Sequence, residues 1–270
     1  MSQHLRLRPA TAAQGLRWVG DGLRLWRRQP LVLTGLFLML LMALTLLAAL
    51  PFVGGTLASV LMPACNAGLM CCAQAVQQGR WPHPAMLLAA WRRSPQHTRA
   101  MLTLGLLYAA AMLLLAVLWY WLDDGALTQL LVAHGGRVTP ELLQEPQFPA
   151  AFRSALHRLA LMAVVYLPIA VLFWLAPALV YWHNTPPAKA LFFSATAVLR
   201  NASAYLAFAF GWLGVFLFAG FALALLAALP GIGTVAIALT MPVCVCLVAA
   251  LVVSIWSTFL GSFTPEPPPV

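Results

Sequence analysis

The sequence predicts an all-α fold: a polytopic membrane bundle of six transmembrane helices, joined by short amphipathic surface helices. Of its 270 residues, 63% are hydrophobic and only 8% are charged, and the mean hydropathy is +0.89. Soluble domains do not have this composition. Six apolar runs are each long enough to cross about 30 Å of hydrocarbon as a helix. They are approximately Leu31 to Leu50, Thr56 to Gln78, Ala100 to Leu122, Leu159 to Trp182, Ala202 to Leu229 and Thr234 to Leu260.

The basic residues indicate which side of the membrane each loop occupies. If six helices alternate in direction, twelve of the fifteen basic residues fall on one side, which also carries both termini. Cytoplasmic loops carry an excess of Lys and Arg, so this side is predicted to be cytoplasmic. These arginines flank spans and form no separate basic module, so the net charge of +9 does not indicate nucleic-acid binding.

Proline and glycine divide the chain into hairpins. The uncharged segments Pro51 to Gly55 and Pro230 to Gly233 break two long apolar stretches, because these residues stop helices. The predicted periplasmic loop, at about residues 123–158, is the sizeable polar segment. Asp124 and Thr139 are suited to cap two short helices there. The transmembrane domain is thus expected over residues 31–263, followed by a disordered proline-rich tail at residues 264–270.

Residues 1–30 are predicted to form a cytoplasmic segment with an amphipathic helix. Polar side chains recur at steps of three and four, and an apolar stripe occupies the facing side. The predicted anchor residues of this stripe are Leu16, Val19, Leu23 and Trp26. Two interpretations stay open, since the helix can lie on lipid or dock on the underside of the bundle.

Similar short helices are expected before the third and fifth spans, at Pro84 to Arg93 and Pro187 to Arg200. An internal repeat supports this unit. Met62-Pro63 matches Met241-Pro242, Gly54 matches Gly233, and Cys65 matches Cys244, all at one offset of 179. Both copies start on the same side, so the repeat is parallel, which suggests a pseudo-two-fold axis along the membrane normal.

The interior of the spans carries little chemistry. Their central portions contain no Asp, Glu, Lys, Arg or His, which counts against proton relays and ion-coupled transport. Polar residues there serve either interhelical hydrogen bonding or a solute path. The candidates are Asn66, Gln74, Tyr108, Tyr166, Ser254 and Ser257. Candidate hinges are the prolines of the returning helices, Pro63, Pro177 and Pro242.

Glycines in the spans are expected to allow close helix packing, with Gly105 in the third span and Gly211, Gly214 and Gly220 in the fifth. The five cysteines lie in apolar runs and the six histidines are scattered. We therefore expect no disulfide, metal or cofactor. The sequence has no nucleophile elbow, phosphate loop or paired intramembrane acids, so we expect no enzymatic activity.

Several motifs carry a family resemblance. They are Gly15-Leu16-Arg17-Trp18, Asp21-Gly22, the run Leu25 to Pro30, the Leu-Pro-x-x-Gly hairpins and Leu199-Arg200-Asn201. With them the chain resembles a family of six-span inner-membrane proteins of proteobacteria with no assigned function. It is also distantly similar to the membrane domain fused to some glycerophosphodiester phosphodiesterases. The resemblance implies a bacterial inner membrane and supplies no catalytic residues.

Two functions are carried forward. The first is a non-catalytic scaffold or accessory subunit that contacts the lipid bilayer and a membrane-protein partner or a second copy. The alternative is a transporter or flippase-like protein for an apolar or amphipathic solute, with Asn66, Gln74 and the kinked returning helices lining the path.

The charge pattern predicts that both termini are cytoplasmic, because an even number of spans returns the chain to its starting side. Alkaline phosphatase and green fluorescent protein fusions to each loop measure this directly. A fusion after Val270 should be fluorescent and lack phosphatase activity, whereas a periplasmic signal there would contradict the topology.

Overall fold

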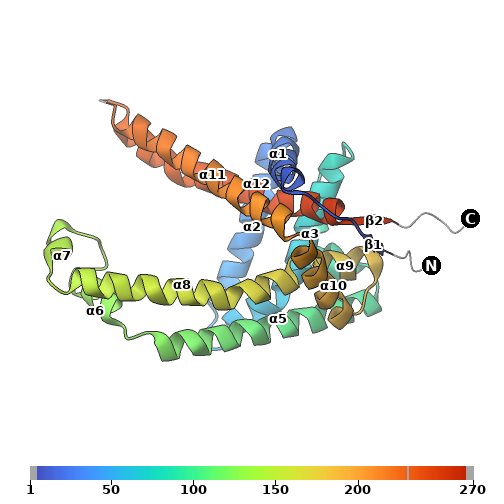
Figure 1. The fold of residues 1–270 in the computed structure, drawn as a ribbon, viewed down its shortest axis with the longest axis horizontal. Helices are drawn as coiled ribbons and strands as arrows, with labels where there is room; N and C mark the ends of the chain where they lie inside the picture. The colour runs from blue at the N-terminus through green and yellow to red at the C-terminus, as the bar shows by residue number, and fades with distance from the viewer. Residues whose placement is uncertain (1–4, 230, 266–270) are drawn as a thin grey trace, which may run out of the picture.

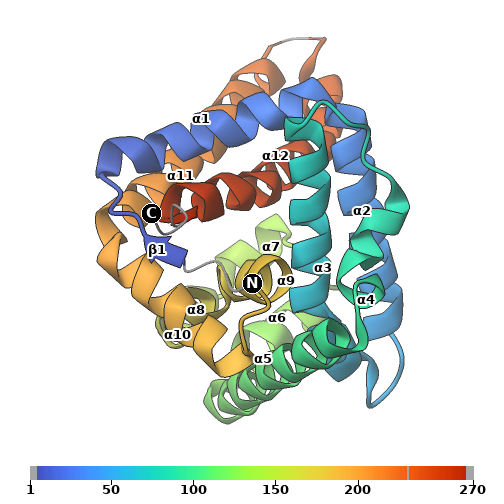
Figure 2. The ribbon, with the colours of Figure 1, turned by 90° about the vertical axis from the view of Figure 1, so that its right-hand side faces the viewer.

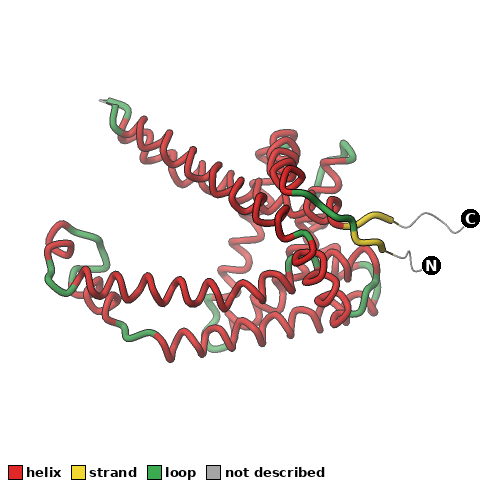
Figure 3. Tube along the Cα trace, in the orientation of Figure 1, coloured by secondary structure: helices red, strands yellow, loops and turns green. Residues whose placement is uncertain are grey.

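The computed structural model describes residues 5–229 and 231–265 and consists almost entirely of helices (Figure 3). Among these described residues, six helical segments are long and apolar enough to span a membrane, which confirms the predicted all-α polytopic fold. They are α2 (Pro30–Ala48), α3 (Gly54–Gln77), α5 (Pro95–Leu122), α8 (Phe148–Phe173) continued by α9 (Ala176–His183), α11 (Ala202–Ala227) and α12 (Gly233–Ser262).

Each pair of spans follows a short helix or helical turn, here called an elbow helix. The elbow helices are α1 (Ala12–Arg28), η1 (Pro84–Leu88) with α4 (Ala89–Arg92), and α10 (Pro187–Arg200). They precede the hairpins α2–α3, α5–α8/α9 and α11–α12, respectively. The expected surface segments at Pro84 to Arg93 and Pro187 to Arg200 are therefore helical, and the chain consists of three similar units (Figure 1).

The three units pack in a ring. The second elbow helix contacts α3, α10 contacts α8 and α9, and α1 contacts α11 and α12. Each elbow helix thus packs on the hairpin of the preceding unit, and α1 closes the ring on the last one. Figure 2 shows this ring from the end that carries β1. The two hairpins matched by the sequence repeat are neighbours in a ring of three, and not a two-fold pair as the repeat suggested.

Small residues bring the elbow helices into near backbone contact with the spans. A Cβ on Gly15 would lie 1.9 Å from the Ala204 carbonyl oxygen, and one on Gly22 would lie 2.1 Å from the Ser254 Cβ. The second elbow helix also approaches a span closely at a glycine. A Cβ on Gly68 of α3 would lie 2.5 Å from the Leu87 carbonyl oxygen of η1. Such approaches are how helices associate where lipid is as apolar as the side chains.

The buried face of α1 differs from the predicted stripe. The structure buries Gly15, Trp18, Val19, Gly22 and Leu25. Among the predicted anchors, Val19 is buried and Leu23 and Trp26 are half-buried, whereas Leu16 is 55% exposed. The docked face includes two glycines, which a search for large apolar side chains does not select. Of the two interpretations, α1 docks on the bundle, and lipid contact by Leu16 stays a prediction.

Two short strands, one near each end of the chain, pair with each other beside α1. Strand β1 (Leu5–Leu7) pairs antiparallel with β2 (Phe263–Pro265). The buried Asn201 side chain accepts from the Ala10 amide at 2.8 Å and donates to the Arg8 carbonyl at 3.1 Å. Thr264 and Pro265, predicted to belong to a disordered tail, are thus in a strand, because their backbone finds partners in β1. The rest of that tail, residues 266–270, lies outside the described residues.

The loop between α5 and α8 folds into two short helices as expected, α6 (Ala126–Ala133) and α7 (Pro140–Gln144). Asp124 accepts from the Ala126 amide at 3.1 Å, and Thr139 caps α7 through the Leu142 amide at 3.3 Å. Arg158 lies 2.6 Å from Asp124, and this contact lowers the pKa of the Asp124 carboxyl. The ion pair between Asp124 and Arg158 therefore holds the loop against α8 of the same hairpin.

The close contact at Gly22 predicts a stability difference between two neighbouring glycines. Gly22→Ala forces its Cβ into Ser254, and overpacking of this kind costs about 1 to 3 kcal/mol. Gly20→Ala is the matched control, since its Cβ would meet only the end of Arg24, at 3.9 Å. It should gain about 1 kcal/mol from helix propensity. Thermal unfolding in mild detergent measures both variants, and equal melting temperatures would contradict the docking of α1.

Candidate functional site

A cavity of about 180 Å³ lies between α3, α5, α12 and the junction of α8 with α9. It contains five of the residues selected from the sequence, namely Pro63, Asn66, Tyr108, Tyr166 and Pro177. The remaining walls are mainly apolar and come from Met62, Ala170, Phe173, Trp174 and Ile255. Residues far apart in the chain thus converge on one uncharged site within the spans.

An interruption of the fourth span shapes this cavity. Helix α8 ends at Phe173 and α9 begins at Ala176, with Pro177 in its first turn. The Leu175 amide donates to the Ser194 hydroxyl at 3.0 Å, and that hydroxyl donates to the Val171 carbonyl at 2.9 Å. A side chain of α10 therefore satisfies backbone groups that the interruption releases, as a break in a membrane helix requires.

Aromatic side chains fix the walls of the cavity on either side of the interruption. The Trp174 indole donates to the Thr258 hydroxyl of α12 at 3.1 Å. The Tyr108 ring packs edge-on against Phe173, with centroids 5.0 Å apart. Both tryptophan and tyrosine are thus held by helices other than their own, which makes the cavity a preformed feature of the fold.

The polar groups of the cavity are neutral. Tyr108 of α5, Tyr166 of α8 and the half-buried Asn66 of α3 line the cavity together. Two hydroxyls and an amide can orient a neutral or amphipathic molecule, but they supply no charge for ion binding. The volume is below the roughly 300 to 1,000 Å³ of sites for drug-sized ligands, so it fits a small polar group or part of an acyl chain.

The other sequence candidates lie elsewhere. Gln74 is half-buried on α3 outside the cavity, and Pro242 is exposed in the outer part of α12. Ser254 is buried under α1, where it accepts from the Trp212 indole at 3.1 Å. Ser257 lines a different pocket. Whether Pro63, Pro177 or Pro242 acts as a hinge stays a prediction.

Sequence reasoning missed the residues that hold the site together. They are Ser194 and Trp174, which hold the helix interruption in place. A serine in a surface helix is ordinary, and no local signal indicates a partner 19 residues earlier. Within the part of the chain that the structure describes, no three His, Cys, Asp or Glu side chains gather as metal ligands would.

The comparisons with known proteins agree with this architecture. A relative from Burkholderia thailandensis, named as a probable inner membrane protein, is 32% identical over 266 residues, which cover 98% of this chain and 96% of the relative. No family model and no solved structure matches the chain. The resemblance to the phosphodiesterase membrane domain stays a prediction from the motifs. With full-length similarity and six candidate spans, the chain is a multi-pass inner-membrane protein and belongs to the family of this relative.

Proposed function

We propose that this protein is a non-catalytic scaffold or accessory subunit of the inner membrane that presents its α11–α12 hairpin to a partner helix. The supporting observation is a pair of glycines in α11 that face open space. A Cβ on Gly214 or Gly220 would meet nothing within 4 Å, whereas Gly105 and Gly211 pack against Val60 and α1. A glycine inside a helix lowers helix stability by about 1 kcal/mol relative to alanine. At Gly214 and Gly220, no close packing within the described chain compensates for this loss.

The surroundings of Gly220 suit a docked helix. The hairpin diverges from α5 and α8 (Figure 1), and between Leu217 and Cys246 no described residue belongs to either hydrophobic core cluster. A groove of about 230 Å³ between α11 and α12 is lined largely by small residues, including Ala219, Gly220 and Ala236. Small residues at a membrane helix surface let a second backbone approach closely.

Crosslinking in native membranes tests the scaffold function. A photo-crosslinking residue at Thr240, which lines the groove, should give a discrete adduct with a partner or a second copy. The same residue at Leu114, which is 72% exposed on α5, should give lipid adducts alone. Gly220→Leu should abolish the Thr240 adduct. Gly35→Leu is the matched control, because Gly35 of α2 also faces open space and lies outside the groove.

Absence of a protein adduct at Thr240, or identical adducts at Thr240 and Leu114, would contradict the scaffold function. Retention of the adduct in Gly220→Leu would show that the groove is not the contact surface.

The cavity favours a second candidate, a transporter or flippase-like protein for an apolar or amphipathic solute. Interrupted helices line substrate sites in many transporters, and here the interruption adjoins three neutral hydrogen-bonding groups. Under this function the solute would pass between α3, α5 and α8, with Asn66 and the two tyrosines orienting its polar end.

Lipid and metabolite profiling of a deletion strain distinguishes this candidate. Complementation with Asn66→Leu should fail to restore the parental profile, because it removes the amide from the cavity wall. Complementation with Gln74→Leu should restore it, since Gln74 is a half-buried polar residue of the same helix outside the cavity. Equal behaviour of the two variants, at matched protein levels, would count against a solute path here.

A further inference from the structure

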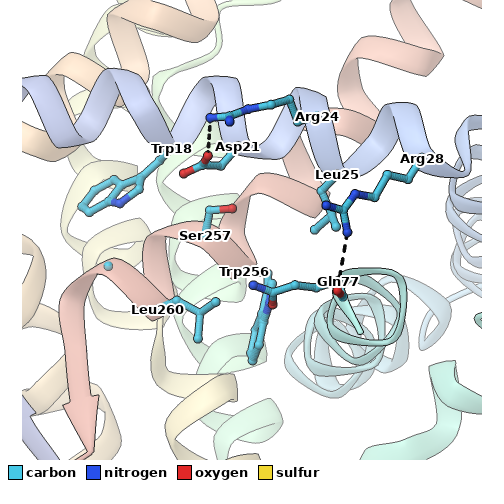
Figure 4. Close-up of a pocket in the computed structure, with 10 residues that line it drawn as sticks. Trp18, Asp21, Arg24, Leu25, Arg28, Gln77, Trp256, Ser257 and Leu260 are labelled. Carbon is cyan, nitrogen blue, oxygen red and sulfur yellow. Dashed lines mark hydrogen bonds and ion pairs between the residues drawn. The ribbon is translucent and has the colours of Figure 1, made fainter. Parts of the chain in front are cut away.

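A pocket of about 400 Å³ lies beneath α1, separate from the cavity and the groove (Figure 4). Arg24 and Arg28 of α1 form its upper edge, Gln77 lies at the end of α3, and Trp256 and Ser257 of α12 form its floor. Neither function proposed above uses these residues. We propose that this pocket binds the anionic headgroup of a membrane phospholipid, with the lipid phosphate at Arg24 and Arg28.

The charge of the pocket suits a single anion. Arg24 pairs with Asp21 at 2.6 Å, so this carboxylate offsets one of the two guanidinium charges and leaves a net positive site. Arg28 makes one long hydrogen bond, 3.5 Å from Nη1 to the Gln77 carbonyl, and keeps further N–H donors. Guanidinium groups bind phosphate through paired hydrogen bonds, which makes arginine the appropriate side chain for this ligand.

The floor supplies both polar and apolar contacts. The Trp256 indole donates to Gln77 Oε1 at 2.6 Å, which leaves the Gln77 amide nitrogen as a donor on the pocket side. The Ser257 hydroxyl lies below Asp21 in the same view. Trp18 and Leu260 complete the apolar walls. A surface that is basic at one edge and apolar at the other matches the junction of a headgroup with its glycerol and acyl chains.

The position of the pocket agrees with a lipid ligand and not a soluble one. Helix α3 ends at Gln77 and α12 ends at Ser262, so the pocket lies where two spans leave the hydrocarbon. Tryptophan and arginine are enriched at this depth. The pocket is also preformed, because Gly22 packs on Ser254 and the Trp18 indole packs on Gly261. Preformed donors bind without the cost of ordering a flexible segment.

Binding of defined lipids to the purified protein in detergent, measured by native mass spectrometry, tests the proposal. Phosphatidylglycerol should bind in preference to phosphatidylethanolamine. Arg24→Gln/Arg28→Gln should weaken phosphatidylglycerol binding about tenfold or more. Arg17→Gln/Arg27→Gln is the matched control, because it removes the same charge from the same helix outside the pocket and should change binding less than about twofold.

A second variant keeps the charge and closes the space. Ser257→Leu adds an apolar side chain to the floor and should reduce lipid binding as strongly as loss of Arg24 and Arg28. An equal loss of lipid binding in the two double-arginine variants would show that general surface charge explains the effect, and would overturn the proposed site. Unchanged binding in Ser257→Leu would do the same. Displacement of bound lipid by millimolar glycerol 3-phosphate would identify a soluble phosphoester as the ligand and overturn the lipid assignment.

Discussion

The docking of α1 on α11 and α12 is the contact on which the rest of the arrangement depends. Within the described residues, one hydrophobic cluster combines Ala10, Trp18 and Val19 with residues of α11 and α12, so the last hairpin is held mainly by the first helix. The contact works because Gly15 and Gly22 let backbones meet. It closes the ring of three units, buries Ser254, and brings Arg24 and Arg28 to the edge of the pocket whose floor includes Ser257. A larger residue at either glycine would disturb all of these features together.

The same physics explains why the molecule is compact at one end and diverges at the other. Inside a bilayer, apolar helices gain little by leaving lipid for one another, so association requires close backbone approach or interhelical hydrogen bonds. Both occur near the elbow helices, at Gly15, Gly68 and Ser194. Farther out, Gly214 and Gly220 have no such neighbour. Glycines with close neighbours therefore mark where the helices hold together, and the open Gly214 and Gly220 of α11 lie on the surface that we propose for a partner.

The sequence predicted the six spans, the elbow helices and the hairpin turns, because composition and the positions of proline and glycine determine them locally. It also selected Asn66, Tyr108 and Tyr166, but not their meeting at one cavity, since that depends on how three separate helices cross. Of the five residues that α1 buries, the predicted stripe contains Val19 alone, and the two buried glycines could not be selected because they add no apolar side chain to a stripe. The backbone groups released by the interruption of the fourth span are satisfied by Ser194 in the next elbow helix, a partner that no local pattern specifies.

The internal repeat has a structural counterpart at one contact. The offset of 179 that relates Gly54 to Gly233 also relates Gln77 to Trp256, and these two side chains are hydrogen-bonded at 2.6 Å. Units related by rotation bring equivalent residues together only near their common axis. Helices α3 and α12 therefore meet close to the centre of the ring. Pro63 and Ile255 face the cavity, while Gln77 and Trp256 face the lipid pocket. The two sites thus share the same central helix pair, so a shift of α12 against α3 would alter both.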